Sequence, residues 1–293
     1  MNNSLKRRKF RRIVIGLVAA ASIAGTAVPG AGASAPRPLN YVALGDSYSS
    51  AAGNLPLDLT ASPSCQRSTV NYANVITRAI GANLTDVTCG GATTENFNTS
   101  QGTGIAPQLD AVTSSAELVT MTIGGNDGNV FVDLLEGCAT ASLTTLGQGN
   151  PCEQKYGSTF TDAITSTTYP AIVEALEKVK TKAPHARVAI LGYPWIAPAG
   201  GGCYPTLPFA VGDVPYVRSV QATLNEAVMR AAHVTGVTYV DMNSVSNGHD
   251  ACEAPGVRWV EPVVTKDSAA PCHPNALGES EMAARVRDVL KLP

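Results

Sequence analysis

The feature that most constrains the fold is an alternation of short apolar runs, rich in β-branched residues, with longer stretches of helical periodicity. The short runs are typical of strands. Strands that alternate with helices along a chain predict an α/β protein whose parallel sheet is covered on both faces. The predicted strands span residues 39–44, 84–88, 116–123, 186–191 and 237–242.

Three stretches place apolar residues three or four positions apart, as an amphipathic helix requires. They follow the third, fourth and fifth predicted strands and include residues 170–183, 217–231 and 282–289. Two other stretches, 127–160 and 197–215, are loop-rich; the second has a density of Gly and Pro that rules out long regular elements. Both follow strands, so they are candidates for the walls of a ligand crevice, and equally for loops with a purely structural role.

The first 33 residues predict a secretory signal peptide. A cluster of six basic residues precedes an apolar run, and small residues follow it. We place the cleavage after Ala33, because a cut two residues later would leave a proline at the first mature position. A membrane anchor is the alternative, although the apolar run is shorter than the roughly 20 residues that a span needs. An arginine pair in the cluster permits twin-arginine export, so the export route stays open.

The rest of the chain, residues 34–293, has no internal repeat and is predicted to be a single secreted domain without membrane insertion. Six of the 21 basic residues lie in the signal peptide, whereas all 23 acidic residues lie downstream of it. Such an acidic body makes nucleic acid a poor candidate for a partner. We expect a monomer.

Seven cysteines lie downstream of the signal peptide. In an exported protein their first interpretation is disulfides, and three bonds would leave one thiol unpaired. Zinc is the alternative, but no two cysteines lie two to four positions apart and the chain has only four histidines. We therefore expect disulfides and no metal, while the spacing alone does not choose the pairing.

A candidate nucleophile follows the first predicted strand, which runs directly into GDSYSS, residues 45–50. A serine at a strand-to-helix junction lies on a sharp turn, with its hydroxyl exposed and its N–H near a helix N-terminus. Ser and Asp are also ordinary helix caps, so this segment alone is a weak signal. Two glycine-containing segments strengthen it: CGGATT (89–94) follows the second predicted strand, and IGGND (123–127) ends the third.

Together with HPN at residues 273–275, these segments resemble the four sequence blocks of the SGNH (GDSL) hydrolase family, in the family's order and over nearly the whole predicted mature chain. The closer resemblance is to secreted lipases and esterases of actinomycetes. It implies a three-layer α/β/α sandwich, with a flavodoxin-like five-stranded parallel sheet of strand order 2-1-3-4-5. It also implies three disulfides, Cys65–Cys89, Cys138–Cys152 and Cys203–Cys252. Cys272 is then the odd thiol, either buried without a role or open to oxidation and pairing between chains.

Carried over by position, the resemblance implies that Ser47 is the nucleophile and His273 its base. A serine hydroxyl needs an adjacent imidazole to remove its proton as it attacks an ester carbonyl. Gly91 and Asn126, with the N–H of Ser47, are similar to the donors of an oxyanion hole. Gly90 is the alternative to Gly91, and Asn126 as a mere turn residue is the alternative to its role as a donor.

The acid of the catalytic triad departs from the family's usual pattern. The family has Asp three residues before the histidine, where this chain has Ala270. The group in that place has to accept the second ring N–H of His273, and a backbone carbonyl can do so. We therefore expect a dyad whose orienting group is the carbonyl of Ala270 or Pro271. Asp267 or Asp241, brought to the ring by a bent loop, is the alternative.

The function predicted from these residues is a secreted serine ester hydrolase, a lipase or carboxylesterase, that cleaves acyl esters through an acyl-enzyme without any cofactor. Apolar residues in the expected loop walls favour an acyl chain over a sugar; they are Leu55, Leu57, Phe131, Leu134, Leu135, Trp195, Leu207 and Phe209. A phospholipase A or a carbohydrate deacetylase would use the same site. A secreted binding module that has lost catalysis is the alternative from another class.

Overall fold

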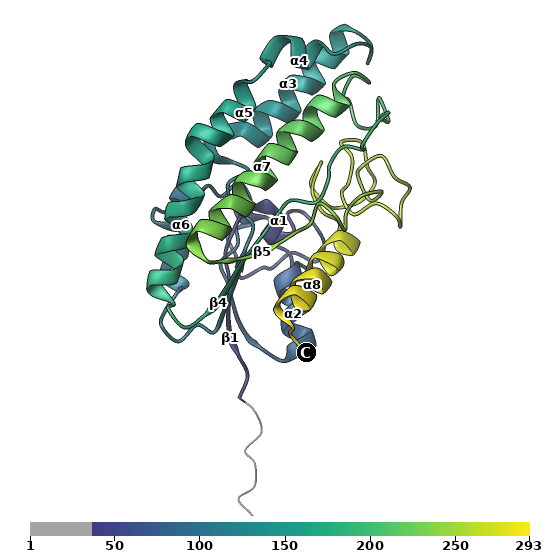
Figure 1. Cartoon of the computed structure of the whole chain (residues 1–293). Helices are drawn as coiled ribbons and strands as arrows, with labels where there is room; N and C mark the ends of the chain where they lie inside the picture. The colour runs from purple at the N-terminus through teal and green to yellow at the C-terminus, as the bar shows by residue number, and fades with distance from the viewer. Residues whose placement is uncertain (1–36) are drawn as a thin grey trace, which may run out of the picture. The chain divides into compact units, whose positions relative to one another are not determined.

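A five-stranded parallel sheet forms the centre of the computed structural model, which describes residues 37–293 (Figure 1). The predicted signal peptide and its cleavage point at Ala33 lie outside the described residues. The strands follow the order β2-β1-β3-β4-β5, which confirms the predicted fold class and strand order. They are β1 (Asn40–Ala43), β2 (Asn83–Asp86), β3 (Leu118–Met121), β4 (Arg187–Leu191) and β5 (Thr238–Val240).

Both faces of the sheet are covered. Successive side chains of a strand point to opposite faces, so neighbouring residues report on each face in turn. In β1 and the residue after it, Tyr41 and Ala43 belong to one apolar cluster, whereas Val42 and Leu44 belong to another. All four side chains are buried. The continuous apolar runs in the sequence therefore reflect burial on two faces rather than one.

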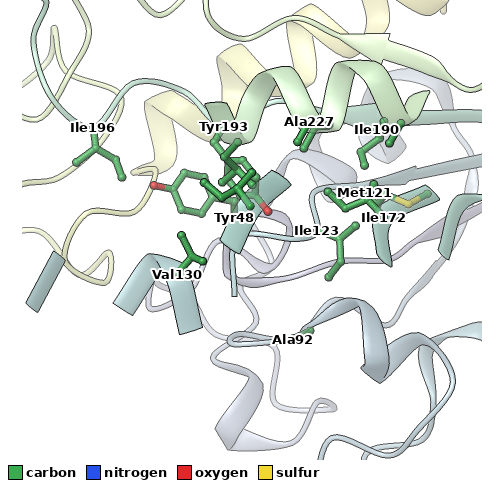
Figure 2. Close-up of a cluster of buried hydrophobic side chains, with 14 of the residues drawn as sticks. Tyr48, Ala92, Met121, Ile123, Val130, Ile172, Ile190, Tyr193, Ile196 and Ala227 are labelled. Carbon is green, nitrogen blue, oxygen red and sulfur yellow. The ribbon is translucent and has the colours of Figure 1, made fainter. Parts of the chain in front are cut away.

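The helices lie in two layers, with α2 and α8 on one face of the sheet and α6 and α7 on the other (Figure 1). Figure 2 shows the core on the α6 and α7 side, where Met121 and Ile190 of the sheet meet Ile172 and Ala227 of the helices. The helices are α1 (Ser47–Ser50), α2 (Tyr72–Ile80), α3 (Val130–Thr144), α4 (Pro151–Tyr156), α5 (Thr159–Ala163), α6 (Tyr169–Lys182), α7 (Val214–Thr235) and α8 (Ala276–Leu290).

The three predicted amphipathic helices are confirmed as α6, α7 and α8. The prediction that residues 127–160 are loop-rich is wrong, because this stretch contains α3, α4 and the beginning of α5. Its Gly, Ser and Thr residues have low helix propensity. However, α3 buries Val130, Leu134 and Cys138, four residues apart on one face, and this tertiary packing outweighs propensity. Residues 197–213, by contrast, contain no helix or strand.

Three disulfides connect loops and helices, with the pairing that the family resemblance implied. Cys65–Cys89 joins the loop after α1 to the loop after β2, and Cys138–Cys152 joins α3 to α4. Cys203–Cys252 closes the largest loop, with a sequence separation of 49. Cys272 is unpaired and buried.

Residues Pro38–Pro293 form one compact unit. No helix within residues 37–293 is long and apolar enough to cross a bilayer.

Candidate active site

Three of the four segments singled out in the sequence lie at the carboxyl ends of the adjacent strands β2, β1 and β3. The connections leave β1 and β3 in opposite directions across the sheet, and open α/β sheets bind ligands at such a switch point. The fourth segment, residues 273–275, immediately precedes α8. The sheet therefore brings together residues that are more than two hundred positions apart.

Ser47 is the first residue of α1, in the sharp turn after β1. Gly45 makes this turn with a φ of 122°, and a Cβ there would lie 2.3 Å from the carbonyl oxygen of Thr122. Asp46 caps α1 by accepting a hydrogen bond from the N–H of Tyr48 (3.0 Å). As the first helical residue, Ser47 has an N–H that the helix itself does not use. Its hydroxyl and its amide are both available to a ligand.

The Nε2 atom of His273 lies 2.7 Å from the Oγ atom of Ser47. The Nδ1 atom of the same ring lies 2.8 Å from the carbonyl oxygen of Pro271. Because a carbonyl only accepts hydrogen bonds, Nδ1 carries the ring proton of the neutral imidazole and Nε2 accepts from the serine hydroxyl. The ring thus has the tautomer that a general base needs.

The alternatives for the orienting group have other partners. The carbonyl of Ala270 accepts the backbone N–H of His273 (3.1 Å), so Pro271 is the one that contacts the ring. Asp267 accepts from the N–H of Ala269 (3.0 Å), and Asp241 from the N–H of Asn243 (2.8 Å). Each carboxylate thus accepts a hydrogen bond from a backbone N–H of its own loop. In the structure neither aspartate is hydrogen-bonded to the ring of His273, which favours the Pro271 carbonyl as the orienting group.

The ring of His273 is buried among aromatic side chains, with only 9% of the residue exposed. Phe131 packs edge-on against it, with ring centroids 5.4 Å apart, and Tyr48 lies at 5.1 Å. The hydroxyl of Tyr48 donates to the carbonyl of Cys272 (2.6 Å) and so holds the backbone next to the ring. Burial lowers the pKa of His273 to about 4, only partly opposed by the Pro271 hydrogen bond. The imidazole is therefore neutral at pH 7.

The two candidate oxyanion donors lie beside Ser47 on the wall of one cavity. The N–H of Gly91 has no acceptor among the described residues, whereas the N–H of Gly90 donates to the carbonyl of Cys65 (2.9 Å). Of the two glycines, Gly91 thus has the free amide. The Nδ2 atom of Asn126 donates to the carbonyl of Ala92 (3.0 Å), which orients the amide and leaves its second hydrogen free.

A buried network behind the site was not foreseen from the sequence. The hydroxyl of Tyr193 donates to Asp46 (2.5 Å) and accepts from the N–H of Gly125 (3.0 Å). Its ring packs edge-on against that of Tyr48, and both side chains are labelled in Figure 2. Burial raises the pKa of Asp46 to about 6, although hydrogen bonds from Thr122 and Tyr193 oppose the rise. Tyr193 follows β4 without any local pattern that marks it, so only the fold reveals its position.

The match to known families agrees with this geometry. The model of the GDSL-like lipase/acylhydrolase family matches residues 43–280, most of the chain. The chain belongs to this family. The resemblance seen in the sequence and the predicted enzyme class, a carboxylic ester hydrolase, are confirmed.

Several relatives of this chain come from Streptomyces. Lipase 2 of Streptomyces coelicolor is 52% identical over 290 residues, which cover 97% of this chain and 98% of that protein. The crystal structure of phospholipase A1 from Streptomyces albidoflavus aligns with a TM-score of 0.71 and 28% identity, over 87% of this chain and 99% of that one. An extracellular lipase from Streptomyces rimosus gives the same TM-score and identity, over 86% and 98%.

In this chain the cavity at the candidate active site has a volume of about 310 Å³. Ser47 and His273 lie on its wall, together with both polar and apolar residues. The remaining lining residues are Ala52, Ser64, Gln66, Gly90, Gly91, Asn126, Phe131, Val132 and Ala270. Within residues 37–293, no group of three or more His, Cys, Asp or Glu side chains could hold a metal ion.

The apolar residues expected to form loop walls are divided among several places. Phe131 and Leu135 line a second cavity, of about 290 Å³, next to the first. Trp195 lines a separate hollow of about 610 Å³ beside α7 and β5, which shares no residue with the site. The other five are either buried in the core (Leu134, Leu207 and Phe209) or exposed (Leu55 and Leu57).

Proposed function

We propose that this chain is a secreted serine ester hydrolase that cleaves acyl esters through a covalent acyl-enzyme on Ser47. The contact of 2.7 Å between the Nε2 atom of His273 and the Oγ atom of Ser47 carries the proposal. Membership of the lipase/acylhydrolase family supports the class of substrate. The basic and apolar N-terminus and the three disulfides support export to an oxidising compartment.

In the first half of the reaction, the Oγ atom of Ser47 attacks the ester carbonyl carbon while its proton passes to Nε2 of His273. The carbonyl oxygen becomes an oxyanion, which accepts hydrogen bonds from the N–H groups of Ser47 and Gly91 and from the Asn126 amide. The intermediate then collapses. The bond to the alcohol oxygen breaks, and Nε2 returns its proton to the leaving alcohol.

In the second half, water replaces the alcohol. His273 takes a proton from the water as its oxygen attacks the acyl carbon, and the oxyanion forms at the same donors. The bond to Ser47 breaks, the serine regains its proton, and the carboxylic acid leaves. The Pro271 carbonyl stabilises the imidazolium in both halves by accepting its Nδ1–H.

The test is hydrolysis of p-nitrophenyl acetate by the wild type and by Ser47→Ala. We expect turnover by the wild type, a serine-bound acyl group detectable by mass spectrometry after rapid quenching, and loss of both in the variant. Binding without turnover by the folded wild type would instead indicate a binding module that has lost catalysis.

A phospholipase A is the second candidate function. The observation that favours it is the alignment with a phospholipase A1 over nearly that protein's whole length. Hydrolysis of a diacyl phospholipid, compared with a triacylglycerol and with an acetylated sugar, distinguishes the lipid esterases from a carbohydrate deacetylase.

A further inference from the structure

A second cavity continues from the active-site cavity along helix α3. It has a volume of about 290 Å³, and it shares Phe131 and Val132 with the cavity that contains Ser47. One wall is a single face of α3, and the other consists of loop residues. The full lining is Phe131, Val132, Leu135, Glu136, Ala139, Pro208, Val263, Pro271 and Cys272.

The lining is predominantly apolar. Glu136 is the one residue with a charged side chain, and it is exposed. From Val132 to Ala139 the helix rises about 10 Å, at about 1.5 Å per residue. The second cavity therefore extends along α3 from Phe131 and Val132, which also line the cavity of Ser47, to Ala139. We refer to it as the α3 groove.

We propose that the α3 groove binds the acyl chain of the ester and that Ala139 limits the length of the chain it accepts. This inference rests on the proposed serine mechanism, because it concerns the part of the substrate that stays bound to Ser47. Apolar area removed from water contributes roughly 25 cal/mol per Å², so a linear alkyl chain gains affinity from each methylene that enters such a groove.

The groove is positioned for the acyl side rather than for the alcohol side. Its first turn is fixed to the segment that carries an oxyanion donor, because the N–H of Phe131 donates to the carbonyl of Gly125 (3.0 Å), the residue before Asn126. The groove therefore begins next to the place where the candidate donors would hold the ester carbonyl, and the proposal assigns it to the acyl chain bonded to that carbonyl. The active-site cavity also has the polar residues Ser64 and Gln66, which suit the hydroxyl groups of a leaving alcohol.

The groove wall is also held rigidly. Cys138, next to Ala139, is joined by a disulfide to Cys152 in α4. On the opposite wall, Cys272 follows Pro271, whose carbonyl contacts the ring of His273, and Tyr48 holds the carbonyl of Cys272. Both walls are thus connected to the reactive residues, and a longer chain gains little room by displacing them.

The test compares Ala139→Phe with Thr140→Phe on the full chain. Thr140 is the next residue on α3; it is exposed and does not line the groove, so it is the matched control. The substrates are p-nitrophenyl acetate and p-nitrophenyl octanoate. We expect Ala139→Phe to lower kcat/KM for the octanoate by about tenfold or more and to leave the acetate unchanged, whereas Thr140→Phe changes neither.

Val263→Phe provides a second variant in case Ala139→Phe does not fold, because Val263 faces the groove from a loop and is 40% exposed. It is expected to lower activity on the octanoate selectively as well. Equal losses on both esters by a folded variant, or no loss on either, would overturn the proposal. If the wild type did not hydrolyse p-nitrophenyl acetate at all, that result would instead contradict the proposed function.

A pair of isomeric esters decides which side of the ester occupies the groove. Ethyl octanoate has its long chain on the acyl side, and octyl acetate has it on the alcohol side. We expect Ala139→Phe to slow hydrolysis of ethyl octanoate alone. Selective slowing of octyl acetate would assign the groove to the alcohol and overturn the acyl assignment.

Discussion

The Nδ1 atom of His273 lies 2.8 Å from the carbonyl oxygen of Pro271, and within residues 37–293 no carboxylate is hydrogen-bonded to the ring. The usual aspartate position is occupied by Ala270. A carbonyl fixes the same tautomer that a carboxylate would, although it carries a partial charge rather than a full one. The identity of the orienting atom is therefore a property of the backbone path through residues 270–273.

Replacement of Asp267 should have little effect on catalysis. Asp267 is exposed, and its Oδ1 atom accepts from the N–H of Ala269 in its own loop. We expect Asp267→Asn to lose less than about tenfold in kcat/KM, whereas Ser47→Ala abolishes activity. Steady-state kinetics with p-nitrophenyl esters measure both. A large loss in Asp267→Asn, with an unchanged circular dichroism spectrum, would contradict the dyad.

The pH dependence of kcat/KM should reflect the burial of His273. A general base works in its neutral form, so activity is lost as the pH falls through its pKa. Burial lowers this pKa to about 4, from the 6.5 of an ordinary histidine. As the pH falls, we expect kcat/KM to stay constant down to about pH 6 and to decrease near pH 4. Return of each sample to pH 7 controls for acid unfolding, and a reversible inflection near 6.5 would contradict the assignment.

At the scale of elements, the site depends on ties between segments that follow different strands. Tyr193, after β4, links the turn after β1 to the turn after β3 by donating to Asp46 and accepting from the N–H of Gly125. Asp127 in turn accepts from the N–H and the hydroxyl of Thr94, which ties the turn after β3 to the segment after β2. The candidate oxyanion donors are thus positioned by neighbouring loops as much as by their own.

The Tyr193 hydroxyl can be tested with Tyr193→Phe. This change leaves the N–H of Gly125 and one oxygen of Asp46 without their buried partner, so the free energy of unfolding should fall by about 1–3 kcal/mol. Displacement of Asn126 should lower kcat with little change in KM. Urea unfolding and steady-state kinetics measure the two effects.

Tyr239→Phe is the matched control, because the Tyr239 hydroxyl makes no hydrogen bond to any described residue. Its stability and kcat should stay near those of the wild type. If Tyr193→Phe also kept the stability and the kcat of the wild type, the hydrogen bonds of the Tyr193 hydroxyl would not be what positions the two turns.

At the scale of the whole molecule, the three disulfides consume six of the seven cysteines. Cys272 is left as a thiol with 1% of its surface exposed, and burial raises its pKa to about 12. Reaction with a thiol reagent requires access and the thiolate form, and the native fold limits both.

Thiol titration should therefore find no reactive group in the native protein and one per chain after unfolding in denaturant. The measurement is the stoichiometry of a chromogenic disulfide reagent, with and without denaturant. No thiol after unfolding would indicate an intermolecular bond through Cys272, and three would indicate that one of the disulfides is absent.

The sequence by itself determined the strands and the three long amphipathic helices, because local periodicity marks each of them. The segments that hold Ser47, Gly91, Asn126 and His273 were identified by their resemblance to the four sequence blocks of the family. The sequence did not predict α3, whose Gly, Ser and Thr residues form a helix only because one face is buried. Nor did it choose between Ala270 and Pro271 or between Gly90 and Gly91. Those choices depend on which carbonyl and which amide are already hydrogen-bonded, and only the tertiary structure, by bringing distant backbone groups together, decided them.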